Sequence, residues 1–178
     1  LLSDLSASWL FPGEQRGSYV ESLSIVGTLV PLTVLSGVLD EGLPSVVLTA
    51  RRSLIAERLG WATGFVVVLT GGVAGVAALV GLPTEHFARV SCLLAGVSLL
   101  GLAMVGLRGA WVAPAAVVAV VSTPGLVSLR YNFIYSLALE DELTVATICL
   151  LVSGLIVYAR RGSAHGAVAR AGDVQRSP

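Results

Sequence analysis

The sequence predicts an all-α fold, a polytopic membrane helix bundle with five transmembrane helices. Of the 178 residues, 55% are hydrophobic, only 12% are charged and none is lysine, whereas a soluble domain averages about 25% charged residues. The apolar residues form runs of about 20, which is the length that crosses a hydrocarbon core roughly 30 Å thick. These runs are continuous rather than alternating, a pattern that favours helices over barrel strands.

Five apolar runs are the expected spans: Ser22–Leu39, Trp61–Leu82, Val90–Leu107, Gly109–Ser128 and Leu143–Ala159. Because the chain opens on Leu1 rather than Met, we expect a sixth helix to precede them. The transmembrane domain is expected to cover residues 1–161. Residues 162–178 lack apolar periodicity, which is typical of a disordered tail.

The arginines orient the expected bundle. Threading five spans places most arginines on one side, namely Arg51, Arg52, Arg58, Arg108, Arg160, Arg161, Arg170 and Arg176, and only Arg16, Arg89 and Arg130 on the other. Cytoplasmic loops carry the excess of Lys and Arg. We therefore expect a multi-pass protein of the cell membrane whose C-terminus is cytoplasmic.

Glycines and prolines shape the expected helices. Gly60 with Gly64, and Gly71 with Gly75, have the small-xxx-small spacing that lets membrane helices approach closely. Gly96, Gly101 and Gly106 recur every five residues, which keeps no single helix face, so they predict no packing stripe.

The prolines predict where helices bend, begin or end. Pro31 predicts a kink in the first span. Pro114 is expected to start the fourth span, and Pro124 to end it.

Residues 125–139 are too few to span twice and too apolar for a free loop. They predict a re-entrant or interfacial element on the outer side of the membrane. Its candidate site residues are Arg130, Tyr131, Asn132, Phe133 and Tyr135. The alternative is that Leu126–Leu139 simply extends the preceding helix.

Nothing in the sequence predicts an enzyme. The expected span centres contain no ionisable residue, although such residues commonly mark function within a membrane. The G-x-S-x-G, H-E-x-x-H and P-loop motifs are absent. Glu85 and His86 fall short of the three or four ligands that zinc takes, so we interpret them as loop residues and expect no metal site. No basic patch indicates nucleic acid.

The segment from 39 to 60, LDEGLPSVVLTARRSLIAERLG, is the most charged stretch between two spans. Gly42 and Pro44 supply a turn and a helix start, so Ser45 to Leu59 is expected to form a cytoplasmic helix. One interpretation is that its arginines are ordinary positive-inside anchors. The other is that the helix docks on a partner protein. The candidate docking residues are Asp40, Glu41, Leu48, Arg51, Arg52, Ile55, Glu57 and Arg58.

Five stretches together resemble the permease subunits of six-helix ATP-binding-cassette exporters: LDEGLP, VVLTARRSLIAERLG, VGLPTEHF, LRGAWVAPAA and PGLVSLRYNFIY. The resemblance covers nearly the whole chain as a layout. It implies that Pro44–Leu59 is a coupling helix that contacts an ATP-binding subunit, and that Gly125–Leu139 is an outer re-entrant pair. It also implies a second permease copy or paralogue as a partner. ATP and Mg would then be bound by the ATPase subunit, with no cofactor on this chain.

The resemblance therefore implies a transmembrane permease subunit that couples ATP hydrolysis in separate subunits to export of an apolar or amphipathic substrate. Two alternatives stay open. One is a non-transporting membrane scaffold or accessory subunit. The other is a small pore-forming protein, although the polar span residues are scattered rather than aligned in a stripe: Ser24, Thr28, Thr33, Ser98, Thr144 and Thr147.

Overall fold

The computed structural model describes residues 25, 27–39, 54–123, 132, 134–136 and 139–162. Its regular elements are all helical, which confirms the all-α class. In chain order they are α3 (Leu29–Ser36), the 3₁₀ helix η2 (Gly37–Leu39), α5 (Leu54–Val80), α6 (Thr84–Val105), α7 (Leu107–Ser122) and α8 (Glu140–Arg161).

Three of these helices are long and apolar enough to cross a membrane: α5 over Ile55–Val80, α6 over Thr84–Val105 and α8 over Glu140–Arg161. They correspond to the second, third and fifth expected spans. The apolar helix α7 has 16 residues, about 24 Å at 1.5 Å per residue, which is short of a typical hydrocarbon core. The described helices at the first expected span are shorter still.

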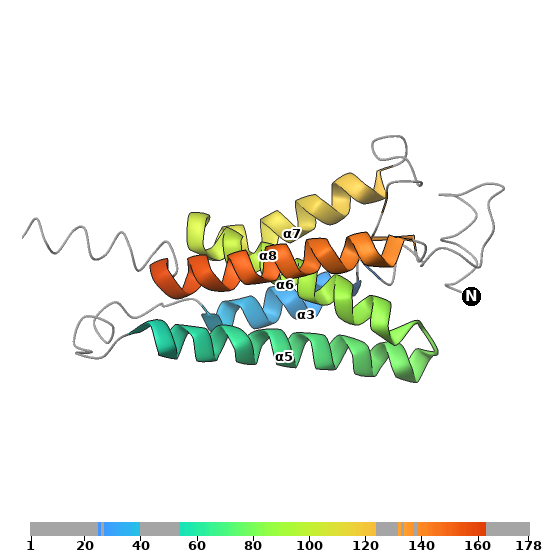
Figure 1. Cartoon of the computed structure of the whole chain (residues 1–178), viewed down its shortest axis with the longest axis horizontal. Helices are drawn as coiled ribbons and strands as arrows, with labels where there is room; N and C mark the ends of the chain where they lie inside the picture. The colour runs from blue at the N-terminus through green and yellow to red at the C-terminus, as the bar shows by residue number, and fades with distance from the viewer. Residues whose placement is uncertain are drawn as a thin grey trace, which may run out of the picture.

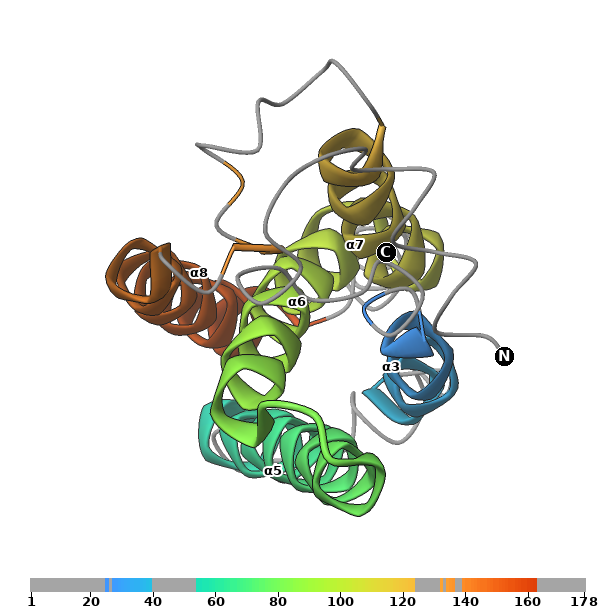
Figure 2. The same ribbon diagram turned by 90° about the vertical axis from the view of Figure 1, so that its right-hand side faces the viewer.

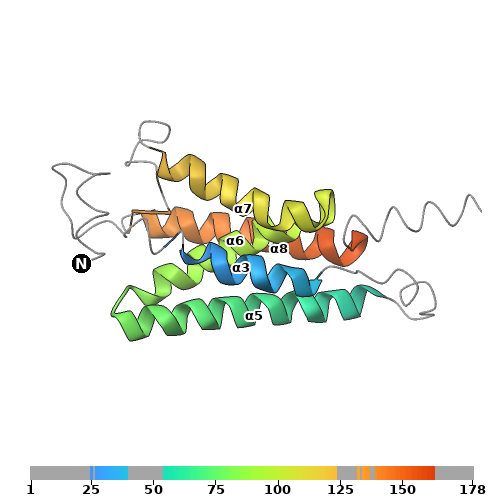
Figure 3. The ribbon, with the colours of Figure 1, turned by 180° about the vertical axis from the view of Figure 1, so that it is seen from behind.

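Helix α6 lies at the centre of the bundle, with α5, α7 and α8 packed around it (Figures 1 and 2). Within the apolar window of α6, 67% of the residues are buried, compared with 28% for α8 and 17% for α5. Helix α3 lies beside α5 and α7, as the view from behind also shows (Figure 3). Most of the surface of α5 and α8 therefore faces outward.

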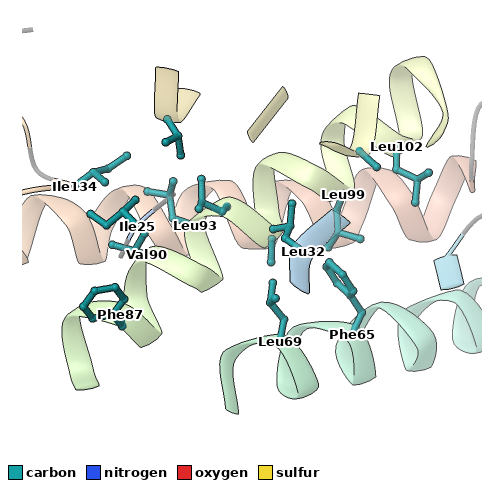
Figure 4. Packing of buried hydrophobic residues seen from close by; sticks show 14 of the residues in the cluster. Ile25, Leu32, Phe65, Leu69, Phe87, Val90, Leu93, Leu99, Leu102 and Ile134 are labelled. Atoms are coloured by element: carbon teal, nitrogen blue, oxygen red, sulfur yellow. The ribbon is translucent and has the colours of Figure 1, made fainter. Parts of the chain in front are cut away.

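The hydrophobic core is centred on α6 and includes buried residues of α3, α5, α7 and α8. Phe65 and Leu69 of α5 point toward Leu32 of α3 and Leu99 of α6 (Figure 4). Large apolar side chains are also exposed on the outside of the bundle, among them Val67, Val68, Val76 and Leu79 on α5 and Val145, Ile148 and Val152 on α8. Extensive exposed apolar surface is typical of a protein that contacts lipid.

Glycines allow α6 to approach both α7 and α8 closely. A Cβ atom on Gly96 would lie 2.7 Å from the main chain of Leu150 in α8, and one on Gly154 would lie 2.6 Å from the carbonyl oxygen of Gly96. Gly101 meets Gly109 of α7 in the same way, since a Cβ on either would overlap the carbonyl oxygen of the other. The five-residue spacing thus serves two different helix contacts, which the sequence did not predict.

The small-xxx-small prediction for α5 was wrong for packing within this bundle. Cβ atoms built on Gly60, Gly64, Gly71 and Gly75 would meet no atom of the described structure within 4 Å. At 100° per residue these four glycines share one face. That face is opposite the buried residues Ala62, Phe65 and Leu69. We call it the glycine face of α5.

A side chain of α6 compensates for a proline inside α7. Pro114 lies eight positions into α7 rather than at its start, so the prediction that it starts a span was wrong. Its missing N–H would otherwise bond to the carbonyl of Ala110, four residues earlier. The hydroxyl of Ser98 donates to that carbonyl at 2.6 Å, in a fully buried position. Hydroxyl groups commonly satisfy main-chain groups freed by proline in membrane helices.

Several helix boundaries differ from the predictions. Helix α5 begins seven residues before Trp61, and α6 begins six residues before Val90. Helix α7 ends at Ser122, and Thr123 is extended, as expected for a residue that precedes proline. Helix α7 therefore ends before Pro124, and most of the range 126–139, which the alternative assigned to an extension of α7, lies outside the described residues.

The proline of the first expected span also has a local consequence. A turn at Thr28 separates α3 from the helical residues Ile25 and Gly27, three positions before Pro31. There the Thr28 hydroxyl donates to the carbonyl of Ile25 at 2.6 Å. The interruption lies where the predicted kink would place it.

Candidate functional site

The charged residues of the described ranges gather at the two ends of the bundle. At one end, where α5 and α7 begin and α8 ends, are Arg58, Arg108, Arg160, Arg161 and Glu57 (Figure 1). We call it the arginine-rich end. At the other are Glu85, His86, Arg89, Glu140, Asp141 and Glu142, and we call this the acidic end. The helices between them carry no charged side chain, so the bundle has an apolar middle and two polar ends.

Exposed tryptophans lie near the arginine-rich end. Trp61 is in the second turn of α5 and is 60% exposed, and Trp111 is in the second turn of α7 and is 45% exposed. Tryptophan is enriched where a membrane meets water. Both residues are therefore placed where an aromatic belt at this end would lie.

Three predicted docking residues are described, and they have different environments. Ile55 is 51% exposed and Glu57 is exposed, both in the first turn of α5. The acidic Glu57 also suits the positive end of the helix dipole. Arg58 is only 6% exposed and its side chain is engaged within the protein. The other candidates, Asp40, Glu41, Leu48, Arg51 and Arg52, lie outside the described residues.

The chain entering this region is anchored to α8. The hydroxyl of Tyr158 donates to the carbonyl of Leu39 at 2.9 Å in a buried position. Leu39 is the last residue of η2, and Tyr158 is in the last turn of α8. Residues 119 positions apart are thus joined at the arginine-rich end, directly before the charged segment.

At the acidic end, an ion pair joins two of the long helices. Nη1 of Arg89 in α6 lies 2.7 Å from Oε2 of Glu140 at the start of α8, and its Nη2 lies 3.4 Å from Oε2 of Glu85 one turn earlier. The Thr147 hydroxyl of α8 donates to the carbonyl of Arg89 at 3.2 Å. Three carboxylates in the first turn of α8 also suit its dipole.

The described residues of segment 132–136 contact the acidic end at three points. Nε2 of His86 lies 2.8 Å from the carbonyl oxygen of Ile134. The Asn132 amide donates to the carbonyl of Val121 in α7 at 2.7 Å. The hydroxyl groups of Tyr135 and Ser122 hydrogen-bond to each other. Asn132, Ile134 and Tyr135 are all buried.

Of the predicted outer element, only Asn132 and Tyr135 among the candidate residues can be placed. Arg130, Tyr131 and Phe133 lie outside the described residues, as does the tail beyond 162. Ile134 and Tyr135 form a turn, and the amides of Tyr135 and Ser136 donate to the carbonyl of Asn132. The described residues thus form a turn docked on α6 and α7.

The interpretation of His86 as a loop residue was wrong. It is the third residue of α6, is fully buried and bonds to a segment 48 residues away. The sequence did carry a signal for this helix start, because Pro83 can precede a helix and Glu85 and Arg89 have the i,i+4 spacing of a helical ion pair. Within the described ranges, no three His, Cys, Asp or Glu side chains form a group that could hold a metal ion.

Comparisons with known proteins identify no relative: no family model, curated protein or solved structure matches this chain.

Proposed function

We propose that this chain is a non-catalytic transmembrane permease subunit of an ATP-driven transporter, with ATP and Mg bound by a separate ATPase subunit. The observation that carries the proposal is the continuity of α5. This single helix of 27 residues begins at Leu54, inside the segment expected to couple to the ATPase, and crosses the bundle to Val80. A displacement of the charged segment would therefore act directly on a membrane helix.

The separation of charges supports the orientation that coupling requires. Four of the five described arginines are at the end where α5 begins, and arginine-rich loops face the cytoplasm. The charged segment 40–53 joins two helices at this same end. We therefore place the arginine-rich end in the cytoplasm, where an ATPase subunit would meet it.

The glycine face of α5 supports a second copy or a paralogue as partner. It faces away from the bundle and leaves open space at Gly60, Gly64, Gly71 and Gly75. Small residues at this spacing let two membrane helices approach closely. A contact formed mainly by main-chain and small-residue packing can also slide, as alternating access would require.

The transported substrate is proposed to be apolar or amphipathic. The middles of α5, α6 and α8 contain no ionisable side chain that could recognise an ion. Hydroxyl groups of the inner helices are also used internally, since Ser91 donates to the carbonyl of Phe87 and Ser98 to that of Ala110. Such hydroxyls form no polar lining, which favours a permease over a small pore.

Purification from native membranes tests this proposal. We expect an ATPase subunit to co-purify with the tagged chain, and its substrate-stimulated ATPase activity to fall at least about tenfold in the double variant Arg51→Glu/Arg52→Glu, because charge reversal opposes docking. Arg58 is left unchanged because it is buried, so its replacement would also disturb the fold.

The matched control is Arg160→Glu/Arg161→Glu, which reverses two exposed charges at the same end of the bundle. This control should keep the ATPase bound and active. Recovery of the chain without any ATPase would refute the permease proposal and leave the scaffold alternative. Equal losses in the two double variants would show that net charge, rather than the coupling segment, matters.

A further inference from the structure

The contact between His86 and Ile134 has a feature that the proposed function does not use. A carbonyl oxygen can only accept a hydrogen bond, so Nε2 of His86 must carry the hydrogen in the 2.8 Å contact with Ile134. In the neutral ring Nδ1 is then a bare acceptor. It is buried and has no hydrogen-bond partner in the described structure.

Asn132, two residues from Ile134, has the same deficiency. Its amide nitrogen donates to Val121, but its side-chain oxygen is buried without a partner in the described structure. Docking of this segment therefore leaves two buried acceptors unpaired, and each such atom costs stability. These two costs reduce the free energy by which the docked arrangement is favoured over one in which the two atoms reach water.

The charged groups around His86 act in opposite directions on a protonated ring. Arg89, one turn further along α6, is the cation of this cluster, and it already pairs with Glu140 of α8 and with Glu85. Tyr135 on the docked segment is bonded to Ser122. Burial, which removes water from the ring, is the main effect that disfavours a protonated His86. Among the charges, Glu140 would attract the added proton and Arg89 would repel it.

We infer that His86 is a pH-sensitive latch, which holds the 132–136 segment on α6 while the ring is neutral and releases it when the ring is protonated. Histidine is the side chain whose charge changes between about pH 5 and 8. The protonated ring gains solvation only by leaving its buried position, and the bond to Ile134 is lost with it. This latch operates at the acidic end and does not depend on the proposed transport activity.

Hydrogen exchange of the full chain in lipid nanodiscs tests the latch. The readout is the protection of the amides of Tyr135, Ser136 and Leu139, whose main-chain bonds go to Asn132 and Ser136. After correction for intrinsic exchange rates, we expect protection to fall about tenfold between about pH 7.5 and pH 5.5. Protection of α6 amides near Leu99, in the core, should not change.

Three variants separate the latch from general acid sensitivity. His86→Gln keeps an N–H donor that cannot become charged, so its protection should be independent of pH. His86→Phe should show low protection at both pH values. His165→Gln, which changes the only other histidine, should behave like the wild type.

Two results would overturn the latch. One is wild-type protection that stays constant or rises on acidification, as when a protonated ring pairs with Asn132. The other is an equal loss in His86→Gln. If neither His86 variant folds, the chemical shifts of the ring nitrogens of His86 are followed by NMR in the wild type instead. Protonation of the ring at a pH different from that at which protection is lost would then overturn the latch.

Discussion

At Ala110, the main chain of α7 has a carbonyl group that its own helix cannot use, because the residue four positions later is Pro114. Ser98 of α6 donates to this carbonyl, so one hydroxyl both satisfies a buried acceptor and joins two helices. In a membrane, where water is scarce, an unpaired carbonyl would be costly. This residue pair therefore explains how proline is accommodated inside a helix at a buried contact.

Replacing Ser98 with alanine should destabilise the protein by about 1–2 kcal/mol, because the Ala110 carbonyl loses its donor. In a Pro114→Ala background the helix regains its own N–H donor, and the same replacement should cost less than about half as much. Reversible unfolding in mixed micelles measures this double-mutant cycle. The exposed Ser153→Ala is the control, and strictly additive effects of the two substitutions would contradict the assignment.

For single residues, the sequence predicted the end of the bundle at which a charged side chain lies better than it predicted what a polar side chain contacts. The five described arginines lie at the ends to which the span order assigned them, since each described helix carries its charges near its termini. The roles of His86 and Ser98 were missed because their partners, Ile134 and Ala110, are main-chain carbonyls. A carbonyl acceptor has no side-chain signature, so such bonds become visible only in three dimensions.

At the scale of helices, glycines decide which faces approach and which stay open. Gly101 and Gly109 bring α6 and α7 into main-chain contact, whereas Gly71 on α5 meets open space. Spacing alone could not distinguish them: the four-residue spacing of α5 predicted packing within the chain, and the five-residue spacing of α6 predicted none. Which neighbour each face meets depends on the tertiary arrangement.

Gly101→Ala should therefore destabilise the bundle by about 1–3 kcal/mol or more, because the added Cβ overlaps the main chain of Gly109 and forces α6 and α7 apart. The matched change Gly71→Ala should leave the unfolding free energy within about 0.5 kcal/mol of the wild type. The same unfolding measurement compares them. Equal costs at the two positions would show that the α6–α7 contact is not as close as described.

Helix existence was predicted more accurately than helix boundaries. The apolar runs located α5, α6 and α8, but Glu85 and His86 were interpreted as loop residues although they belong to the first turn of α6. Within α6, Arg89 pairs with Glu85 one turn earlier, and it also pairs with Glu140 of α8. Glu57 and Arg58 were predicted to lie in a helix that ends at Leu59, before the second span. They belong to α5, which continues through Leu59 without a break.

At the scale of the whole molecule, the described bundle has an apolar middle between an arginine-rich end and an acidic end. Such a distribution matches a membrane with water on both sides, and the exposed Trp61 and Trp111 match one of its interfaces. The proposed coupling to an ATPase depends on this arrangement. If the arginine-rich end did not face the cytoplasm, the charged segment before α5 could not reach an ATP-binding subunit.

Side-specific labelling tests this orientation most directly. In a background with Cys92 and Cys149 changed to alanine, single cysteines are introduced at Asp141, exposed at the acidic end, and at Ser163, which directly follows the last described residue at the arginine-rich end. Intact cells are treated with a membrane-impermeant maleimide. We predict that Asp141→Cys is labelled in intact cells and Ser163→Cys only after permeabilisation. The reverse pattern, or labelling of both positions from outside, would contradict the account.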